Sequence, residues 1–220
     1  FKDNNLNTEI NYNNLKLDLQ KLKIKLIAYT KNKKKLEIIK KNLKEKNKIF
    51  YSSINYYLNH DIAASIKKAI ELEEQNKKNP FVNEMIGSLL FIEGNYKKSS
   101  LHYKQAIDKF NKLKISPPLN IKLSFAKSLI EINDEKSLKK SLSILEELIP
   151  IKYNSIYFWK LIGINAEKLG DKPASLVAIA EEKILKKEYE KAKTFASRAL
   201  KYKNIKTLYK IRALDIINFK

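Results

Sequence analysis

The stretch SIYFWKLIGINAEKLGDKPASLVAIA, Ser155 to Ala180, decides the fold. It places a small residue, Gly163, in the middle of one apolar helical pattern and a second glycine, Gly170, where that pattern ends. Another small residue, Ser175, lies in the helical pattern that follows. Two antiparallel helices approach closely only where the facing positions carry no bulky side chain. The stretch therefore predicts a helical hairpin whose two helices cross at small residues.

The same arrangement recurs along the chain. The 12-residue step from Gly163 to Ser175 is found in three other places, which are Ser53 to Ser65, Gly87 to Ser99 and Ala180 to Ala192. Small residues also recur at a spacing of 34 residues, from Ser65 to Ser99 and from Ser141 to Ser175. A fixed period of this length is typical of helical repeat proteins.

Trp159, Ile162, Gly163 and Ala166 occupy the places of the W-x2-L-G-x2-Y pattern and so resemble the helix pair of tetratricopeptide (TPR) repeats. The sequence therefore predicts an all-α protein built as a right-handed superhelical stack of TPR-like antiparallel helix pairs. Helices are expected at about 9–30, 33–46, 48–59, 62–76, 80–93, 96–113, 119–132, 136–149, 155–169, 173–187, 189–203 and 206–218.

Two further expectations follow from this pattern. The prolines should all lie at helix starts or joints, where a missing N–H is tolerated; they are Pro80, Pro117, Pro118, Pro150 and Pro173. Large apolar side chains of the helical stripes should be mostly buried, namely Leu101, Tyr103, Phe125, Leu145, Trp159 and Phe195.

The chain is expected to have two parts. Residues 1–47 contain no small-residue crossing positions and form a helical lead-in or linker, whereas residues 48–220 form the TPR-like repeat domain. The first 50 residues carry a net charge of +9, so a solvated lysine-rich helix is the alternative reading of the lead-in.

The net charge of +21 on 220 residues raises the question of a polyanionic partner. Of the 45 basic residues 43 are lysines, and Lys, Asn and Ile together supply 94 residues. Their codons are AT-rich, so mutational bias produces the same excess without selection for a polyanion. The runs Lys31–Lys35 and Lys40–Lys48 are the best candidates for contact with nucleic acid or an anionic membrane surface, and a solvated face is the favoured reading of both.

The sequence contains no pattern typical of catalytic or metal sites. It has no cysteine, and its two histidines are each followed at i+4 by alanine, His60 by Ala64 and His102 by Ala106. A zinc peptidase helix of the H-E-x-x-H type needs histidines at i and i+4. Glycines are never closer than seven residues, which excludes the glycine-rich phosphate loops and the G-x-S-x-G turn. We expect this chain to be non-catalytic and to hold no cofactor or metal.

The first residues, FKDNNLNTEINYNN, contain no apolar region of a signal peptide, and no apolar run is long enough to span a bilayer. Because residue 1 is Phe rather than Met, we expect the chain to be a processed product or an excised part of a longer protein.

At the level of whole segments the chain resembles the C-terminal TPR domain of periplasmic zinc metallopeptidases of the BepA type, the β-barrel-assembly-enhancing protease family. The segments that carry this resemblance are GDKPASLVAIAEEKILKKEYEKAKTFASRALKY from Gly170 to Tyr202, IRALDI from Ile211 to Ile216, NPFVNEMIGSLLFIEGNYKKSSLHYKQAI from Asn79 to Ile107, and YNNLKLDLQKLKIKLIAY from Tyr12 to Tyr29. The peptidase domain of that family, with its H-E-x-x-H helix and zinc, has no counterpart here, so no catalytic or zinc-binding residue is carried over.

The resemblance implies a non-catalytic, periplasmic protein–protein interaction domain. Its partners would be the cognate peptidase domain and either an assembly component or an unfolded outer-membrane protein client. The alternative function is a basic helical module that binds nucleic acid or an anionic membrane surface. Its binding affinity would fall steeply as the salt concentration rises.

In a TPR stack the first helix of each pair lines the concave face, so positions near its small residue should meet the partner. This rule selects Phe50, Ile54, Tyr57, Glu84, Ser88, Phe91, Leu123, Lys127, Ile130, Lys160, Ile164 and Glu167 as partner-binding residues. The set mixes aromatic residues with both signs of charge, which suits a peptide or partner helix better than a phosphate backbone. Tyr57, Phe91 and Lys160 are the candidate anchors. The alternative is that these residues pack against terminal helices of the chain itself or against a peptidase domain.

Overall fold

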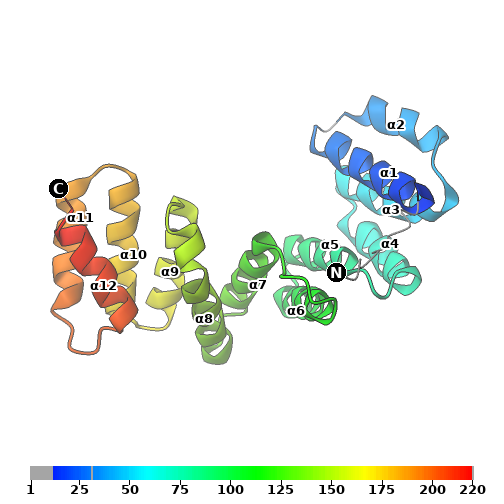
Figure 1. The fold of residues 1–220 in the computed structure, drawn as a ribbon. Helices are drawn as coiled ribbons and strands as arrows, with labels where there is room; N and C mark the ends of the chain where they lie inside the picture. The colour runs from blue at the N-terminus through cyan, green and yellow to red at the C-terminus, as the bar shows by residue number, and fades with distance from the viewer. Residues whose placement is uncertain (1–11, 31, 220) are drawn as a thin grey trace, which may run out of the picture. The chain divides into compact units, whose positions relative to one another are not determined.

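The computed structural model describes residues 12–30 and 32–219, and every regular element in those ranges is an α-helix (Figure 1). The all-α prediction is therefore confirmed. The described residues form two compact units, one that ends at residue 95 and one that begins at residue 96. The predicted start of the α1 helix, residues 9–11, lies outside the described residues.

The helices of the two units follow the predicted order closely. The first unit holds α1 (Tyr12–Tyr29), α2 (Lys33–Lys41), α3 (Glu45–Leu58), α4 (Ile62–Gln75) and α5 (Pro80–Ile92). The second unit holds α6 (Tyr96–Lys112), α7 (Leu119–Ile132), α8 (Glu135–Lys152), α9 (Ile156–Lys168), α10 (Lys172–Leu185), α11 (Tyr189–Leu200) and α12 (Thr207–Ile217).

In the first unit α3 is the central helix. It packs against α4 and α1, α2 packs against α1, and α5 packs against α4. Ile24 of α1 and Leu36 of α2 are buried in the same core as Tyr51, Leu72 and Ile86. The helices α1 and α2 thus share the core of the first unit, and the division into a lead-in of residues 1–47 and a repeat domain of residues 48–220 stays a prediction.

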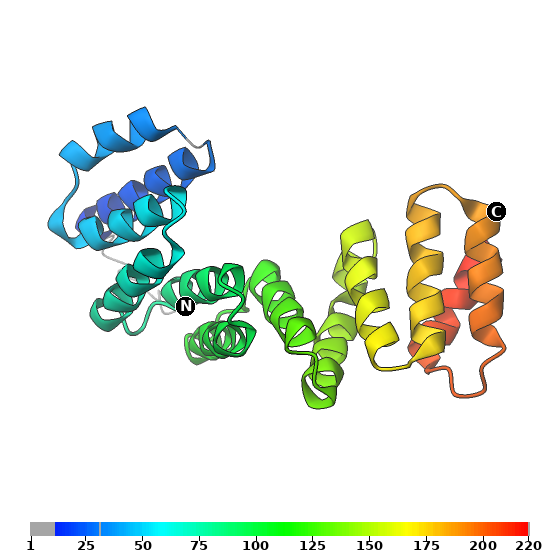
Figure 2. The ribbon, with the colours of Figure 1, turned by 180° about the vertical axis from the view of Figure 1, so that it is seen from behind.

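In the second unit α10 has the most neighbours, because it contacts α9, α11 and α12. Both ribbon views show α10 and α11 side by side (Figures 1 and 2). The core around α10 contains Trp159, Phe158 and Tyr209, which are the bulkiest of its fully buried side chains. Alanines on α10 and α11 complete this core and allow the two helices to lie close together.

Small residues lie where α3 crosses α4 and where α7 crosses α8. Ser53 of α3 and Ser65 of α4 are fully buried and exchange hydrogen bonds: Ser53 Oγ donates to the Ser65 carbonyl at 2.8 Å, and Ser65 Oγ donates to the Ser53 carbonyl at 2.7 Å. Ser141 Oγ of α8 likewise donates to the Ala126 carbonyl of α7 at 2.9 Å. Hydroxyl-to-backbone bonds of this length require the two helix backbones to be in close proximity.

In the part of the chain that the structure describes, polar side chains fix the starts of six helices. In each of these the residue before the helix accepts a hydrogen bond from a backbone N–H of the first turn, which satisfies one of the unpaired donors. These N-cap residues are Asn32, Asp61, Asn79, Asp134, Ser155 and Asp171.

Several helices end through one repeated backbone closure. A residue in the left-handed conformation follows the helix, and the next N–H bonds a carbonyl five residues earlier, as in Asp171 N–H to Ala166 at 2.9 Å. Gly94 and Gly170 take the left-handed position without strain, at φ of 85° and 71°. His60, Lys114 and Lys187 adopt the same conformation, at φ of 64°, 57° and 61°, although their side chains disfavour it.

Two details of the sequence prediction are wrong. Pro150 lies inside α8 rather than at a joint, because the helix continues for one more half-turn to Lys152; a proline there removes only one hydrogen bond, and the buried Leu148 and Ile149 hold the turn. Leu101 is 59% exposed, since the buried stripe of α6 runs through Ser99, Tyr103 and Ala106 on the opposite side of the helix.

The other expected core residues are placed as predicted or nearly so. Tyr103, Phe125, Leu145 and Trp159 are buried, and Phe195 is half-buried against the core of the second unit.

Arg212 of α12 joins three elements of the second unit. Its Nε donates to Glu181 of α10 at 2.5 Å, and its guanidinium lies 5.6 Å from the ring centroids of both Trp159 and Tyr153. The Trp159 indole N–H donates to the Tyr153 carbonyl at 2.6 Å, which fixes the rings. Glu181 is only 3% exposed, and burial raises its pKa while the bond from Arg212 opposes that rise. A planar guanidinium can stack and bond at once, which an ammonium cannot do in this geometry.

Replacing Arg212 should show how much the buried Glu181 carboxylate destabilises the folded protein when it has no partner. We expect Arg212→Met to lower the free energy of unfolding by about 3 kcal/mol at neutral pH, because Glu181 is left buried and unpaired. The loss should shrink at acidic pH, since protonation of Glu181, whose pKa is raised in the folded state, removes the unpaired charge. Urea unfolding of the variant at pH 4 and pH 7 measures both effects. The double variant Glu181→Met/Arg212→Met should recover most of the loss, and an equal loss at both pH values would contradict this role of Glu181.

The strained helix ends give a second prediction. Lys187→Gly and His60→Gly should each raise the free energy of unfolding by about 1 kcal/mol, because glycine adopts the left-handed conformation without steric cost. Ser197→Gly in the exposed middle of α11 is the matched control and should lower it by about 0.5 kcal/mol. Chemical denaturation of the three variants measures whether each substitution raises or lowers the free energy of unfolding.

Candidate functional site

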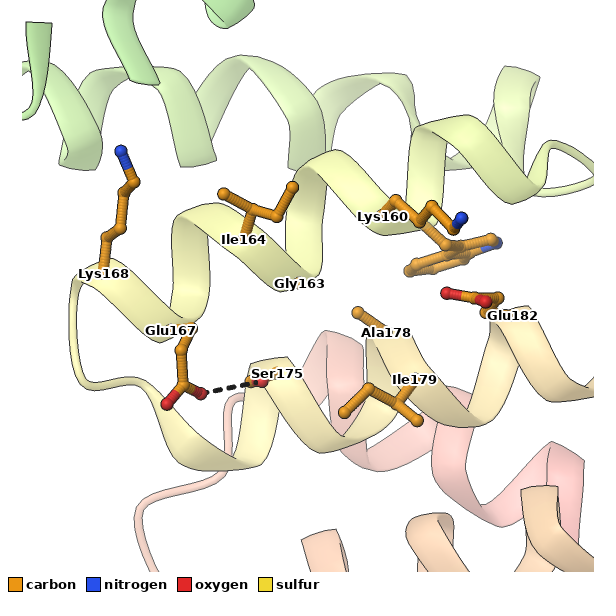
Figure 3. Close-up of a pocket in the computed structure, with 10 residues that line it drawn as sticks. Lys160, Gly163, Ile164, Glu167, Lys168, Ser175, Ala178, Ile179 and Glu182 are labelled. Carbon is orange, nitrogen blue, oxygen red and sulfur yellow. Dashed lines mark hydrogen bonds between the residues drawn. The ribbon is translucent and has the colours of Figure 1, made fainter. Parts of the chain in front are cut away.

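Two grooves, one in each unit, contain most of the partner-binding residues predicted from the sequence. The α9–α10 groove, with a cavity volume of about 590 Å³, is lined by residues of those two helices (Figure 3). These residues are Trp159, Lys160, Gly163, Ile164, Glu167 and Lys168 from α9, and Ser175, Ala178, Ile179 and Glu182 from α10.

The floor of the α9–α10 groove is open because small residues face each other there. A Cβ atom placed on Gly163 would lie 3.5 Å from the Cβ of Ala178, which is an ordinary van der Waals contact. The separation of α9 and α10 at this point therefore leaves room for a methyl group, but not for a large side chain. Ile164, which is 50% exposed, and the half-buried Ile179 add apolar surface beside this crossing.

Charged groups of both signs surround the apolar floor. Lys160 and Glu182 lie at one end of the groove, and Glu167 and Ser175 lie at the other (Figure 3). Ser175 Oγ donates to Glu167 at 3.2 Å, and Lys172 also bonds Glu167. The bonds from Lys172 and Ser175 hold the pKa of Glu167 below its usual value, so Glu167 is ionised at neutral pH.

Lys168 is fixed at the edge of the α9–α10 groove by a different contact. Its Nζ donates to the Ile130 carbonyl at 3.2 Å, near the C-terminal end of α7. A cation is favourable at that end of a helix, where unpaired carbonyls concentrate negative charge. The bond also ties α9 to α7, the first helix of the preceding pair.

The α3–α5 groove lies in the first unit. It is lined by Lys25 and Ala28 of α1, Ile54, Tyr57 and Leu58 of α3, and Glu84, Met85, Ser88, Leu89 and Ile92 of α5. Most of these side chains are apolar. Glu84 is half-buried among them, and this burial raises its pKa, while the nearby charge of Lys25 acts in the opposite direction. A carboxylate that has lost part of its hydration among apolar groups favours a ligand that brings a cation or a hydrogen-bond donor.

The structure brings together part of the predicted partner-binding set. Ile54, Tyr57, Glu84 and Ser88 line the α3–α5 groove, and Lys160, Ile164 and Glu167 line the α9–α10 groove. Phe50 and Ile130 are buried in the cores and present almost no surface to a partner. The half-buried residues Leu123, Lys127 and Phe91 line neither groove.

Sequence reasoning missed the walls that other helices supply. It counted only the first helix of each pair, so Ala178, Ile179 and Glu182 of α10 were not selected. It also missed Lys25 and Ala28 of α1, because a position rule for repeats says nothing of a helix outside the repeat. The 12-residue step from Gly163 to Ser175 could have indicated that α10 forms the second wall of this groove.

The described residues include no cluster of three or more His, Asp or Glu side chains placed to hold a metal ion. His60 is exposed in the turn between α3 and α4, and His102 is half-buried on α6. Within the same residues, no helix has the length and apolar character that crossing a membrane requires.

Substitutions of increasing side-chain volume at Gly163 test how closely α9 and α10 approach each other there. Gly163→Ala should leave stability unchanged or raise it by up to about 1 kcal/mol, because the added methyl fits beside Ala178 and alanine favours a helix. Gly163→Leu should lower the free energy of unfolding by about 1–3 kcal/mol through overpacking. Thermal and urea unfolding give both values. Similar stabilities for the alanine and leucine variants would show that the helices are not in close contact there.

No family model, no curated protein and no solved structure matches this chain. The resemblance to the TPR domain of BepA-type metallopeptidases therefore remains a prediction.

Proposed function

We propose that this chain is a non-catalytic helical-repeat domain that binds protein segments in its grooves. The observation that carries the proposal is the composition of the α9–α10 groove, where an apolar floor at Gly163 and Ala178 is bordered by charges of both signs. Such a groove suits an extended peptide or a partner helix, which offers apolar side chains for the floor and polar groups for the edges.

The mixed charge of the grooves argues against a phosphate backbone as the ligand. Glu167 and Glu182 border the α9–α10 groove, and Glu84 lies in the α3–α5 groove. Acidic side chains at these positions disfavour a polyanion, whereas a protein segment can bring basic side chains to them.

We further propose that the helices are arranged as a right-handed superhelical stack of TPR-like pairs. The contacts of α3 with α4, α7 with α8 and α9 with α10 support it, because each joins consecutive helices through small residues. The bond from Lys168 to the Ile130 carbonyl supports it further, since it joins the first helices of two successive pairs.

A more specific function is suggested by the sequence resemblance alone. On that resemblance we propose that this domain is the TPR portion of a periplasmic zinc metallopeptidase that takes part in outer-membrane protein assembly or quality control. Zinc would then belong to a peptidase domain, and the groove would bind an unfolded β-barrel client or an assembly component.

Direct binding to such a client tests the proposal. We expect a urea-denatured outer-membrane β-barrel protein, labelled and diluted into buffer, to bind the chain by fluorescence anisotropy. Ile164→Glu/Ile179→Glu should weaken binding at least tenfold, because the charges occupy the apolar floor. Tyr57→Ala should weaken it less, since a single side chain at the edge of the other groove is lost. Leu101→Glu/Ile211→Glu, two exposed positions outside the grooves of the second unit, is the matched control and should bind like the unmodified chain.

Circular dichroism and melting temperature must confirm that each variant is folded. Equal affinity of the α9–α10 groove variant and the control would overturn the proposal. Binding that RNA displaces and that moderate salt abolishes would favour the basic-module alternative instead.

A further inference from the structure

A stripe of exposed leucines runs along α1. Leu19, Leu22 and Leu26 are 48%, 52% and 57% exposed, and their spacing of three and four residues places them on one side of the helix. Ile24, on the opposite side, is fully buried in the core of the first unit. Apolar side chains on the outer side of a helix that already buries an inner face point to a further contact.

Lysines flank this stripe on both sides. Helical geometry places the exposed Lys23 on one side of the leucines and Lys25, which also lines the α3–α5 groove, on the other. The α2 helix repeats the pattern: Ile38 is 62% exposed on the side opposite the buried Leu36. Exposed lysines surround Ile38 along α2, namely Lys34, Lys35 and Lys41. We refer to the exposed residues Leu19, Leu22, Lys23, Leu26, Lys34, Lys35, Ile38 and Lys41 as the α1–α2 surface.

The positive charge of the first unit is concentrated in this segment. Residues 19–48 contain twelve lysines and two glutamates, a net charge of +10, whereas residues 49–95 carry a net charge of −2. Mutational bias toward lysine would act on exposed positions throughout the unit. The contrast between two adjacent segments therefore indicates that bias toward lysine alone does not account for the charge of residues 19–48.

The α1–α2 surface is held in place by hydrogen bonds to the rest of the first unit. Gln20 donates to the Asn42 carbonyl at 3.1 Å and accepts from Asn47 at 3.0 Å, which fixes α1. Tyr51 of α3 donates to Glu37 of α2 at 3.0 Å. Burial, together with this bond, raises the pKa of Tyr51 to about 12, so the phenol remains a donor at neutral pH.

We propose that the α1–α2 surface binds the surface of an anionic lipid bilayer. Leucines at the boundary of head groups and acyl chains, flanked by lysines that meet lipid phosphates, are the pattern of helices that lie in the membrane interface. Nucleic acid would use the lysines but not the leucines, because aliphatic side chains offer no ring on which bases can stack. A bilayer can bind both the leucines and the lysines of the α1–α2 surface. No residue of this surface lines either groove.

Co-sedimentation of the full chain with vesicles tests the proposal. The chain should bind vesicles of phosphatidylcholine with about one third phosphatidylglycerol, and bind pure phosphatidylcholine at least tenfold less. Binding should fall as salt rises toward about 0.5 M, where surface charges are screened.

Two sets of variants separate the apolar and the ionic parts. Leu19→Gln/Leu22→Gln/Leu26→Gln should lower the partition coefficient about tenfold, whereas Leu101→Gln/Leu113→Gln/Leu214→Gln, exposed leucines of the second unit, should leave it unchanged. Lys34→Gln/Lys35→Gln/Lys41→Gln should lower it about fivefold per lysine, and Lys201→Gln/Lys203→Gln/Lys210→Gln is the control with equal charge loss.

All the substituted positions are exposed, so the variants should keep the circular-dichroism signal of the parent. Equal binding to neutral and anionic vesicles, or unchanged binding of the leucine variant, would overturn the proposal. Absence of vesicle binding together with retention of RNA by the unmodified chain would overturn it in favour of nucleic acid.

Discussion

Close approach of paired helices is the constraint on which the other features depend. Two helices reach the separation seen at Ser53 and Ser65 only if neither carries a bulky side chain at the crossing. Once the backbones are this close, the neighbouring large residues are forced to the sides, where they form the cores around Trp159 and Tyr51. The same constraint forms the α9–α10 groove. There Gly163 and Ala178 contribute almost no side-chain volume, and among the described residues the space beside them is a groove.

The sequence determined the helices because periodic apolar residues and polar caps act locally. Asp61, Asp134 and Asp171 begin their helices through bonds to residues three positions away, and Gly94 and Gly170 close theirs in the left-handed conformation. The errors arose where tertiary packing outweighed a local rule. Pro150 is accommodated within the last turn of α8 because buried side chains hold that turn.

The candidate site could be predicted only in part, for a related reason. Ile164 and Glu167, which the position rule for the first helix of each pair selected, line a groove, because their neighbours along the same helix decide their direction. The rule could not find Ile179 or Lys25, since those walls come from helices whose approach depends on packing. It also selected Phe50 and Ile130, which the cores enclose. Local periodicity gives the direction of a side chain, and only the packed structure shows whether it reaches solvent.

Serine at the helix crossings has a consequence for how this chain tolerates its unusual composition. Volume restricts a crossing to glycine, alanine or serine, and of these only serine has codons in which A and T predominate. A sequence rich in Lys, Asn and Ile can therefore keep its crossings small by using serine, as at Ser53, Ser65 and Ser141. A buried hydroxyl needs an acceptor, and each of these three donates to a carbonyl of the facing helix. These serines supply directional bonds between helices, which fix the register of a pair more narrowly than alanine contacts would.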